Sequence, residues 1–152
     1  MIVYRISNEV YKNDISGNGA AINGSRWNSK GIKMLYTGEY ISLSILESLV
    51  HLREIDIPQK QYLLTIQIPD IEFQDILLTK LKANWQQHLN YTQWIGEQFI
   101  FAGKSLVLKV PSAIVPQEHN FLINPLHKDF KKVKMVNSEL LELDKRLLKT
   151  QE

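Results

Sequence analysis

The chain is organised around Ile22-Asn23-Gly24-Ser25-Arg26-Trp27-Asn28-Ser29-Lys30-Gly31. This stretch is a loop flanked by glycines, which allow a ligand to approach the backbone closely. An arginine in such a loop can donate two parallel hydrogen bonds to a phosphate or a carboxylate. An apolar segment ending at Tyr36 and a helix carrying Glu47 follow, so a carboxylate could face the same pocket. The alternative is a polar surface turn whose Trp27 fills the core below it.

Composition places the chain among soluble globular proteins. Its 152 residues, 44% hydrophobic and 22% charged, fit one domain spanning 1–152 with a real core. The net charge of +2 is too small to argue for a nucleic-acid partner. Because there is no cysteine, disulfides, zinc–thiolate sites and cysteine nucleophiles are excluded. The sequence shows no membrane-spanning run and no signal peptide, so we expect a cytoplasmic protein without membrane association.

Hydrophobic periodicity predicts a mixture of strands and helices. Strands are expected at 2–6, 32–36, 62–68, 106–110 and 133–136. Helices are expected at 41–53, at 92–101 with Gly103 as the cap, and at 139–148. Residues 13–28, rich in glycine, asparagine and serine, form a long loop of the kind that often carries function.

Three polar residues allow a structural and a functional interpretation. Arg5 is expected at a sheet edge, with a position aimed into a pocket as the alternative. Glu47 lies at the margin of the apolar arc of its helix, and spacing alone favours a solvated glutamate beside His51. Ser112 follows a strand end, where a turn closed by its own hydroxyl is favoured over a ligand contact.

Several common chemistries lack their motifs. We find no phosphate-binding loop of the Walker type, no dinucleotide fingerprint and no Gly-x-Ser-x-Gly elbow. His119 and His127 stand eight positions apart, which is weak evidence for a metal site, so we expect no metal. The lysines at 128, 131, 132 and 134 are typical of a solvated face.

Eight segments, taken in chain order, carry a family resemblance. They are Tyr4-Arg5, 14–20, Gly24-Ser25-Arg26-Trp27-Asn28, Leu35-Tyr36-Thr37, 42–51, 110–116, 120–127 and 144–147. Together they resemble the RES domain family, which is named for an arginine, a glutamate and a serine and forms the toxin half of RES–Xre toxin–antitoxin pairs. Ser25 departs from the pattern, because the family more often has a second glycine there.

The resemblance implies an α+β fold similar to the ADP-ribosyltransferases: a single compact domain with two small, mostly antiparallel sheets around an NAD cleft and flanking helices. It implies cleavage of NAD at the nicotinamide–ribose bond, with NAD as substrate and no cofactor. It also implies a cytoplasmic partner, an Xre-like helix-turn-helix antitoxin that blocks the cleft. Direct nucleic-acid binding is not expected except through that antitoxin.

The resemblance also implies roles for individual residues. Glu47 would stabilise the positive charge that develops on the ribose, and Ser112 would position the ribose or Glu47 itself. Arg26, expected to be catalytic together with Glu47 and Ser112, would bind the pyrophosphate beside Arg5. Tyr36 would stack on nicotinamide. The residues expected to contact NAD are Arg5, Arg26, Trp27, Asn28 and Tyr36.

The acceptor of the ADP-ribosyl group stays open. Water would give ADP-ribose, inorganic phosphate would give a phosphorylated ADP-ribose, and a protein side chain would make the chain a protein mono-ADP-ribosyltransferase toxin. A short chain with few insertions favours the small acceptors. A different class of function is an RNA-directed or non-enzymatic interaction module that uses the lysines around Lys131 and the ring of Trp27.

Overall fold

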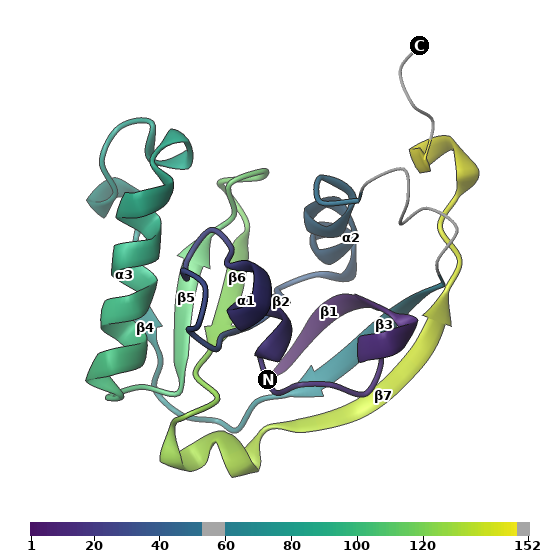
Figure 1. Cartoon of the computed structure of the whole chain (residues 1–152), viewed down its shortest axis with the longest axis horizontal. Coiled ribbons are helices and arrows are strands. Elements are labelled where there is room, and N and C mark those ends of the chain that lie inside the picture. The colour runs from purple at the N-terminus through teal and green to yellow at the C-terminus, as the bar shows by residue number, and fades with distance from the viewer. Residues whose placement is uncertain (53–59, 149–152) are drawn as a thin grey trace.

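The computed structural model of the chain describes residues 1–52 and 60–148. These residues are built around one bent sheet. Within them, seven strands follow the order β4-β5-β6-β2-β1-β3-β7 (Figure 1). The strands pair antiparallel except β4 with β5. Their bounds are β1 Ile2–Asn8, β2 Leu35–Gly38, β3 Gln61–Gln67, β4 Gln74–Asp75, β5 Val107–Pro111, β6 His119–Ile123 and β7 Lys134–Leu141.

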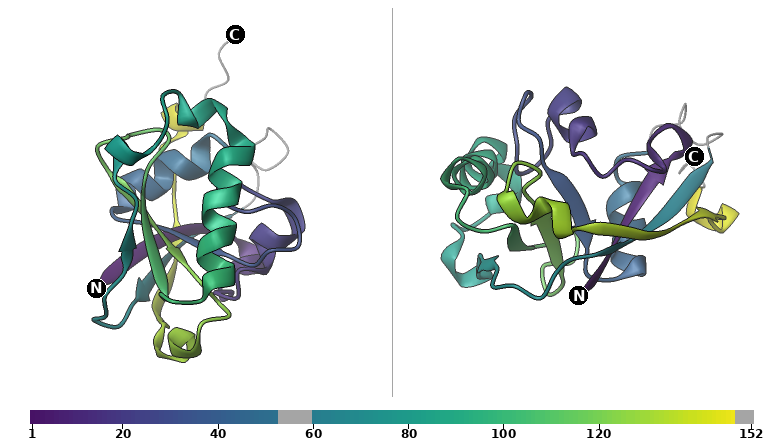
Figure 2. Two further views of the ribbon diagram at one scale, coloured as in Figure 1. Left: turned by 90° about the vertical axis from the view of Figure 1, so that its left-hand side faces the viewer. Right: turned by 90° about the horizontal axis from the view of Figure 1, so that it is seen from below.

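Three α-helices accompany the sheet in the described part of the chain: α1 Asn18–Asn23, α2 Ile41–Leu49 and α3 Leu89–Ala102. Short 3₁₀ turns occupy Glu9–Tyr11, Leu78–Lys80, Trp85–Gln87, Lys128–Lys132 and Lys145–Leu148. Helix α3 runs alongside β5 at one end of the sheet (Figure 2). None of the helices in the described ranges has the length and apolar character needed to cross a membrane.

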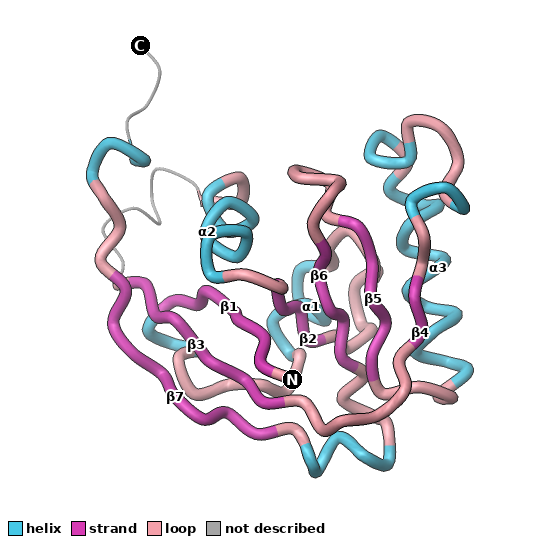
Figure 3. Tube along the Cα trace, turned by 180° about the vertical axis from the view of Figure 1, so that it is seen from behind, coloured by secondary structure: helices cyan, strands magenta, loops and turns pink. Residues whose placement is uncertain are grey.

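The sheet bends where β1 meets β2. These strands share one residue pair, Tyr4 with Gly38, whereas β1 and β3 pair along their whole length from Ile2–Gln67 to Asn8–Gln61. The sheet therefore has two wings, one of β4, β5, β6 and β2 and one of β1, β3 and β7, with α2 between them (Figure 3). The two small sheets expected from the resemblance correspond to these wings, which are joined in one sheet.

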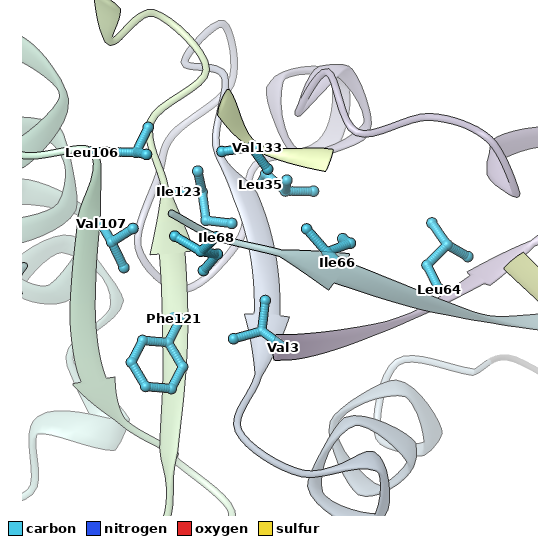
Figure 4. Packing of buried hydrophobic residues seen from close by; sticks show 10 residues of the cluster. All are labelled: Val3, Leu35, Leu64, Ile66, Ile68, Leu106, Val107, Phe121, Ile123 and Val133. Carbon is cyan, nitrogen blue, oxygen red and sulfur yellow. The ribbon is translucent and has the colours of Figure 1, made fainter. Parts of the chain in front are cut away.

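The core lies on both faces of the wing that contains β5 and β6. One cluster includes Val107 and Ile123, and a second includes Leu108 and Leu122, because successive side chains of a strand point to opposite faces. Figure 4 shows the first cluster, in which β1 and β3 also take part. Trp27 belongs to the second cluster and is 2% exposed.

The structure confirms three predicted strands and two predicted helices, with shifted ends. The strands are those at 2–6, 62–68 and 106–110, and the helices are those starting at 41 and 92. Helix α2 ends at Leu49, and residue 53, where its end was expected, lies outside the described residues. The positive φ of Gly103 ends α3, as the sequence predicts. The strand expected at 32–36 begins only at Leu35, and the loop 13–28 contains α1.

The helix predicted at 139–148 is wrong. Strand β7 continues to Leu141, and only a 3₁₀ turn follows at Lys145–Leu148. The leucines of this segment do fit a helical period, but β7 pairs with β3 from Lys134–Gln67 to Leu141–Gln61. Pairing with a distant strand therefore outweighs the local pattern.

The edge position expected for Arg5 is also wrong. Strand β1 lies in the interior of the sheet, between β2 and β3. The alternative expected from the sequence, an arginine aimed into a pocket, is the one that the structure shows for Arg5.

Gly96 brings α3 against the loop that holds Trp27. A methyl group at this position would overlap the backbone carbonyl of Trp27. We expect Gly96→Ala to lower the free energy of unfolding by about 1–3 kcal/mol, because overpacking forces the helix away from the loop. Helix propensity alone predicts the opposite, a gain of about 0.5–1 kcal/mol.

Urea denaturation measures the difference. Gln98→Ala, on the exposed side of the same helix, is the control and should stay within about 0.5 kcal/mol of the parent. A Gly96→Ala protein as stable as the parent would show that the helix and the loop do not need this close approach.

Candidate active site

A cavity of about 850 Å³ opens between the two wings of the sheet, a volume typical of small-molecule sites. Its walls come from β1, the loop before β2, β2 itself, α2, the first turns of α3, the segment before β6 and β6 itself. Residues that the sequence singled out meet here: Arg5, Arg26, Trp27, Tyr36 and Glu47 line the cavity.

Glu47 is fixed at the cavity wall by two neutral donors. Its Oε1 accepts a hydrogen bond from Ser112 Oγ at 2.7 Å and another from Asn120 Nδ2 at 2.7 Å. The glutamate is partly buried, which agrees with the margin of the apolar arc, and its carboxylate is bonded to Ser112 and Asn120. Two hydrogen bonds to one oxygen hold the carboxylate in a single orientation and, among the described residues, leave Oε2 for a ligand.

Ser112 combines both roles that the sequence left open. Its Oγ accepts hydrogen bonds from the backbone N–H groups of Ile114 and Val115, each at 3.1 Å, which closes the expected turn. The same hydroxyl donates to Glu47, and the residue is fully buried. Ser112 therefore orients the carboxylate from behind the cavity wall.

Sequence reasoning gave Asn120 no role. It lies on β6, opposite Gly38 of β2 and Val110 of β5, and its side chain reaches the cavity. The segment 120–127 contributed to the family resemblance, but no spacing rule connects Asn120 with Glu47, 73 positions away. Strand pairing across the wing brings the two together.

Arg5 is a partly buried cation with spare hydrogen-bonding capacity. Its Nη1 donates to the backbone oxygen of Tyr36 at 3.4 Å, and its Nε is buried without a partner among the described residues. Burial lowers the pKa of the guanidinium, an effect that the nearby Asp14 opposes. Because arginine remains protonated in proteins, this position favours an anionic ligand.

Arg26 reaches the cavity from the loop before β2. Its Nη1 donates to the backbone oxygen of Gln86 at 2.9 Å, and its guanidinium carbon lies 5.8 Å from the centre of the Trp85 ring. These contacts hold one side of the Arg26 guanidinium in place. Arg5 and Arg26 thus supply two cations to the cavity that Glu47 lines.

Tyr36 fastens this loop to β2. Its hydroxyl donates to Asn28 Oδ1 at 2.6 Å and accepts from the backbone N–H of Trp27 at 3.0 Å. Burial raises the pKa of the Tyr36 phenol well above its ordinary value, so the hydroxyl stays a neutral donor. The ring lines the cavity, where it can serve as a stacking surface.

Asn28 and Trp27 shape the loop from within. Asn28 Nδ2 donates to the backbone oxygens of Ala20, Ser29 and Ile32 at 2.9, 3.1 and 2.9 Å, and the residue is fully buried. Trp27 packs against Trp85 with ring centroids 5.8 Å apart. Trp27 fills the core, as the alternative interpretation of the loop expects, while Arg26 lines the cavity.

We expect Tyr36→Phe to lower the free energy of unfolding by about 1–3 kcal/mol. The substitution keeps the ring but leaves Asn28 Oδ1 and the N–H of Trp27 without their partner. Urea denaturation provides the measurement, and Tyr40→Phe, at a tyrosine that is 48% exposed, is the matched control. Equal stability of Tyr36→Phe and the parent would contradict a role of the hydroxyl in holding the loop.

Comparison with known proteins gives concordant matches. The sequence model of the RES domain matches residues 2–144. A protein of Photorhabdus laumondii subsp. laumondii named Toxin Res is 35% identical over 153 residues, which is 98% of each chain. A protein of Sphingobium sp. strain YBL2 named Prs ADP-ribosylating toxin is 36% identical over 126 residues, covering 80% of this chain and 78% of that one.

The fold is also similar to a solved structure. A chain in the crystal structure of the M. tuberculosis MbcT–MbcA toxin–antitoxin complex superimposes with a TM-score of 0.77. The match covers 92% of this chain and 83% of that chain at 17% sequence identity, so it establishes a common fold.

Proposed function

The chain belongs to the RES domain family, and we propose that it is the toxin of a toxin–antitoxin pair that degrades NAD by cleaving the nicotinamide–ribose bond. The observation that carries this proposal is the oriented carboxylate of Glu47 in a cavity that also contains two arginines. Depletion of NAD would arrest growth of the cell that produces the protein.

The chemistry of NAD explains why one oriented anion is enough. The nicotinamide ring of NAD is cationic, so it leaves as a neutral molecule when the electron pair of the C–N bond moves to the ring nitrogen. No general acid is needed, in contrast to ordinary glycosides, which require two carboxylic groups. Positive charge develops on the ribose, and a carboxylate fixed beside it stabilises the transition state.

Glu47 is the carboxylate that would stabilise the positive charge on the ribose. Its Oε1 is occupied by Ser112 and Asn120, and Oε2 would accept a hydrogen bond from a ribose hydroxyl. Because the orientation is set before the substrate binds, little reorganisation is needed during the reaction. The side chain thus acts on the ribose, while its two donors act as positioning residues.

The two arginines would bind the pyrophosphate. A guanidinium forms charge-assisted hydrogen bonds to phosphate oxygens, which are roughly twice as strong as neutral ones. Arg5 has a buried Nε without a partner among the described residues, and Arg26 projects from the loop before β2. Tyr36 would stack on the nicotinamide ring from the same cavity.

Water or inorganic phosphate is the acceptor in the favoured form of this proposal. Its oxygen bonds to C1′ of the ribose and loses a proton, giving ADP-ribose or its phosphorylated form. Transfer to a protein side chain is the second candidate, which the name of the Sphingobium relative, Prs ADP-ribosylating toxin, supports. In both cases the same bond to nicotinamide breaks.

We further propose that the partner is an Xre-like helix-turn-helix antitoxin, acting in the cytoplasm, that covers the cavity. The family resemblance motivates this partner, and the fold shared with a chain of the MbcT–MbcA toxin–antitoxin complex supports it. The antitoxin, not this chain, would then provide contacts to nucleic acid.

We expect Glu47→Gln to remove most turnover while leaving the fold and NAD binding largely intact. Glutamine retains an oxygen that can accept from Ser112 and Asn120, but it lacks the negative charge that the ribose cation needs. Release of nicotinamide from NAD by the purified protein, with and without phosphate, measures turnover and identifies the product. Near-normal turnover of the variant would exclude Glu47 as the stabilising anion.

We expect Arg26→Ala to weaken NAD binding by roughly 10- to 100-fold, because one charge-assisted hydrogen bond contributes ~1.5–3 kcal/mol. Calorimetric titration in the Glu47→Gln background avoids consumption of the ligand. Lys33→Ala removes the same charge from an exposed residue and is the control. Unchanged NAD affinity of Arg26→Ala would refute its role as a pyrophosphate ligand.

A further inference from the structure

Gln93, near the start of α3, spans the loop that carries Arg26. Its Nε2 donates to the backbone oxygen of Ser25 at 2.9 Å and to that of Asn28 at 3.1 Å. Because both acceptors are carbonyl oxygens, the amide can take only the orientation in which its nitrogen faces them. Gln93 also lines the cavity, so one side chain links the ends of the loop at the wall of the site.

Two further residues on the same face of α3 extend this contact. Thr92, fully buried, donates from Oγ1 to the backbone oxygen of Arg26 at 2.6 Å. Glu97 accepts hydrogen bonds at Oε1 from the N–H of Ser29, at 3.0 Å, and from the Ser29 hydroxyl. The backbone on both sides of Arg26 is therefore held by three side chains of one helix.

The loop depends on these side chains because it has little regular pairing of its own. Ser25 and Asn28 form an isolated bridge, with the N–H of Ser25 donating to the oxygen of Asn28 at 2.9 Å. Buried backbone oxygens need partners, and α3 supplies them. Gln93 is the member of the set that both holds the two ends of the loop and borders the cavity.

We propose that Gln93 is a positioning residue that sets the affinity of the site for NAD by fixing the backbone from which Arg26 reaches the pyrophosphate. This inference rests on the proposed function, in which Arg26 binds that group. Charge-assisted hydrogen bonds depend steeply on distance and angle, so a small displacement of the guanidinium weakens them. Gln93 acts through Arg26 and need not touch the phosphates.

A double-mutant cycle with Gln93→Met and Arg26→Ala tests this coupling. Methionine matches glutamine in length, while Thr92 and Glu97 still hold the loop, so the variant is expected to fold. In the Glu47→Gln background, Gln93→Met should weaken NAD binding about tenfold when Arg26 is present and have little further effect when Arg26 is absent. A purely structural role would instead give additive losses, and additivity overturns the proposal.

Gln98→Met is the matched control, because Gln98 is the same residue type on the exposed side of the same helix. It should leave NAD affinity unchanged. If Gln93→Met does not fold, Gln93→Leu serves as the second variant: it adds no charge to the cavity and cannot donate to the two carbonyl oxygens. It should weaken binding in the same Arg26-dependent way, and unchanged affinity overturns the proposal.

Amide hydrogen exchange tests the loop without NAD. The N–H of Ser29 is bonded to Glu97, and the N–H of Trp27 to Tyr36, so both exchange slowly only while the loop stays in place. Faster exchange of these amides in Gln93→Met, but not in Gln98→Met, supports the proposal, and equal exchange overturns it.

If the parent binds no NAD, the proposed function fails, whereas NAD binding that Gln93→Met leaves intact overturns the positioning role alone.

Discussion

The close approach of α3 to the loop before β2 is the constraint on which the site depends. Gly96 has no side chain, so the helix can lie directly against the carbonyl of Trp27. Thr92 can then bond the oxygen of Arg26, 66 positions away in the sequence. A loop with buried backbone groups and little pairing of its own would otherwise lose the partners that those groups require. The position of the arginine is thus set by a helix that is remote in the chain.

The bend of the sheet supplies the second half of the site. Because β1 and β2 share only the Tyr4–Gly38 pair, the wings diverge and leave room for α2 and the cavity. Arg5 comes from β1 in one wing, whereas Asn120, which orients Glu47, comes from β6 in the other. The cation and the oriented carboxylate therefore face the same space only while the two wings keep their relative position.

The limits of sequence reasoning follow from these long-range contacts. Alternating residues identified the strands around 62–68 and 106–110, because local periodicity reflects burial on the faces of a sheet. Periodicity failed at 139–148 and for Arg5, where strand order decides the outcome and is not encoded locally. For the site, the resemblance singled out Arg26, Tyr36 and Glu47, which do line one cavity. Asn120 and Gln93 were missed because their partners lie 65 or more positions away.

The charges in the cavity also bear on the choice of ligand. Leaving Arg5 Nε buried and unpaired costs stability, so such a group is retained where an anion can bind it. NAD carries two negative charges on its pyrophosphate and one positive charge on its nicotinamide ring. The cavity carries positive charge from Arg5, Arg26 and Lys30 and negative charge from Glu47, so it matches the two signs of charge on NAD. A ligand with phosphates alone would leave Glu47 facing negative charge, so the carboxylate that drives bond cleavage in the proposed reaction would also select against such ligands.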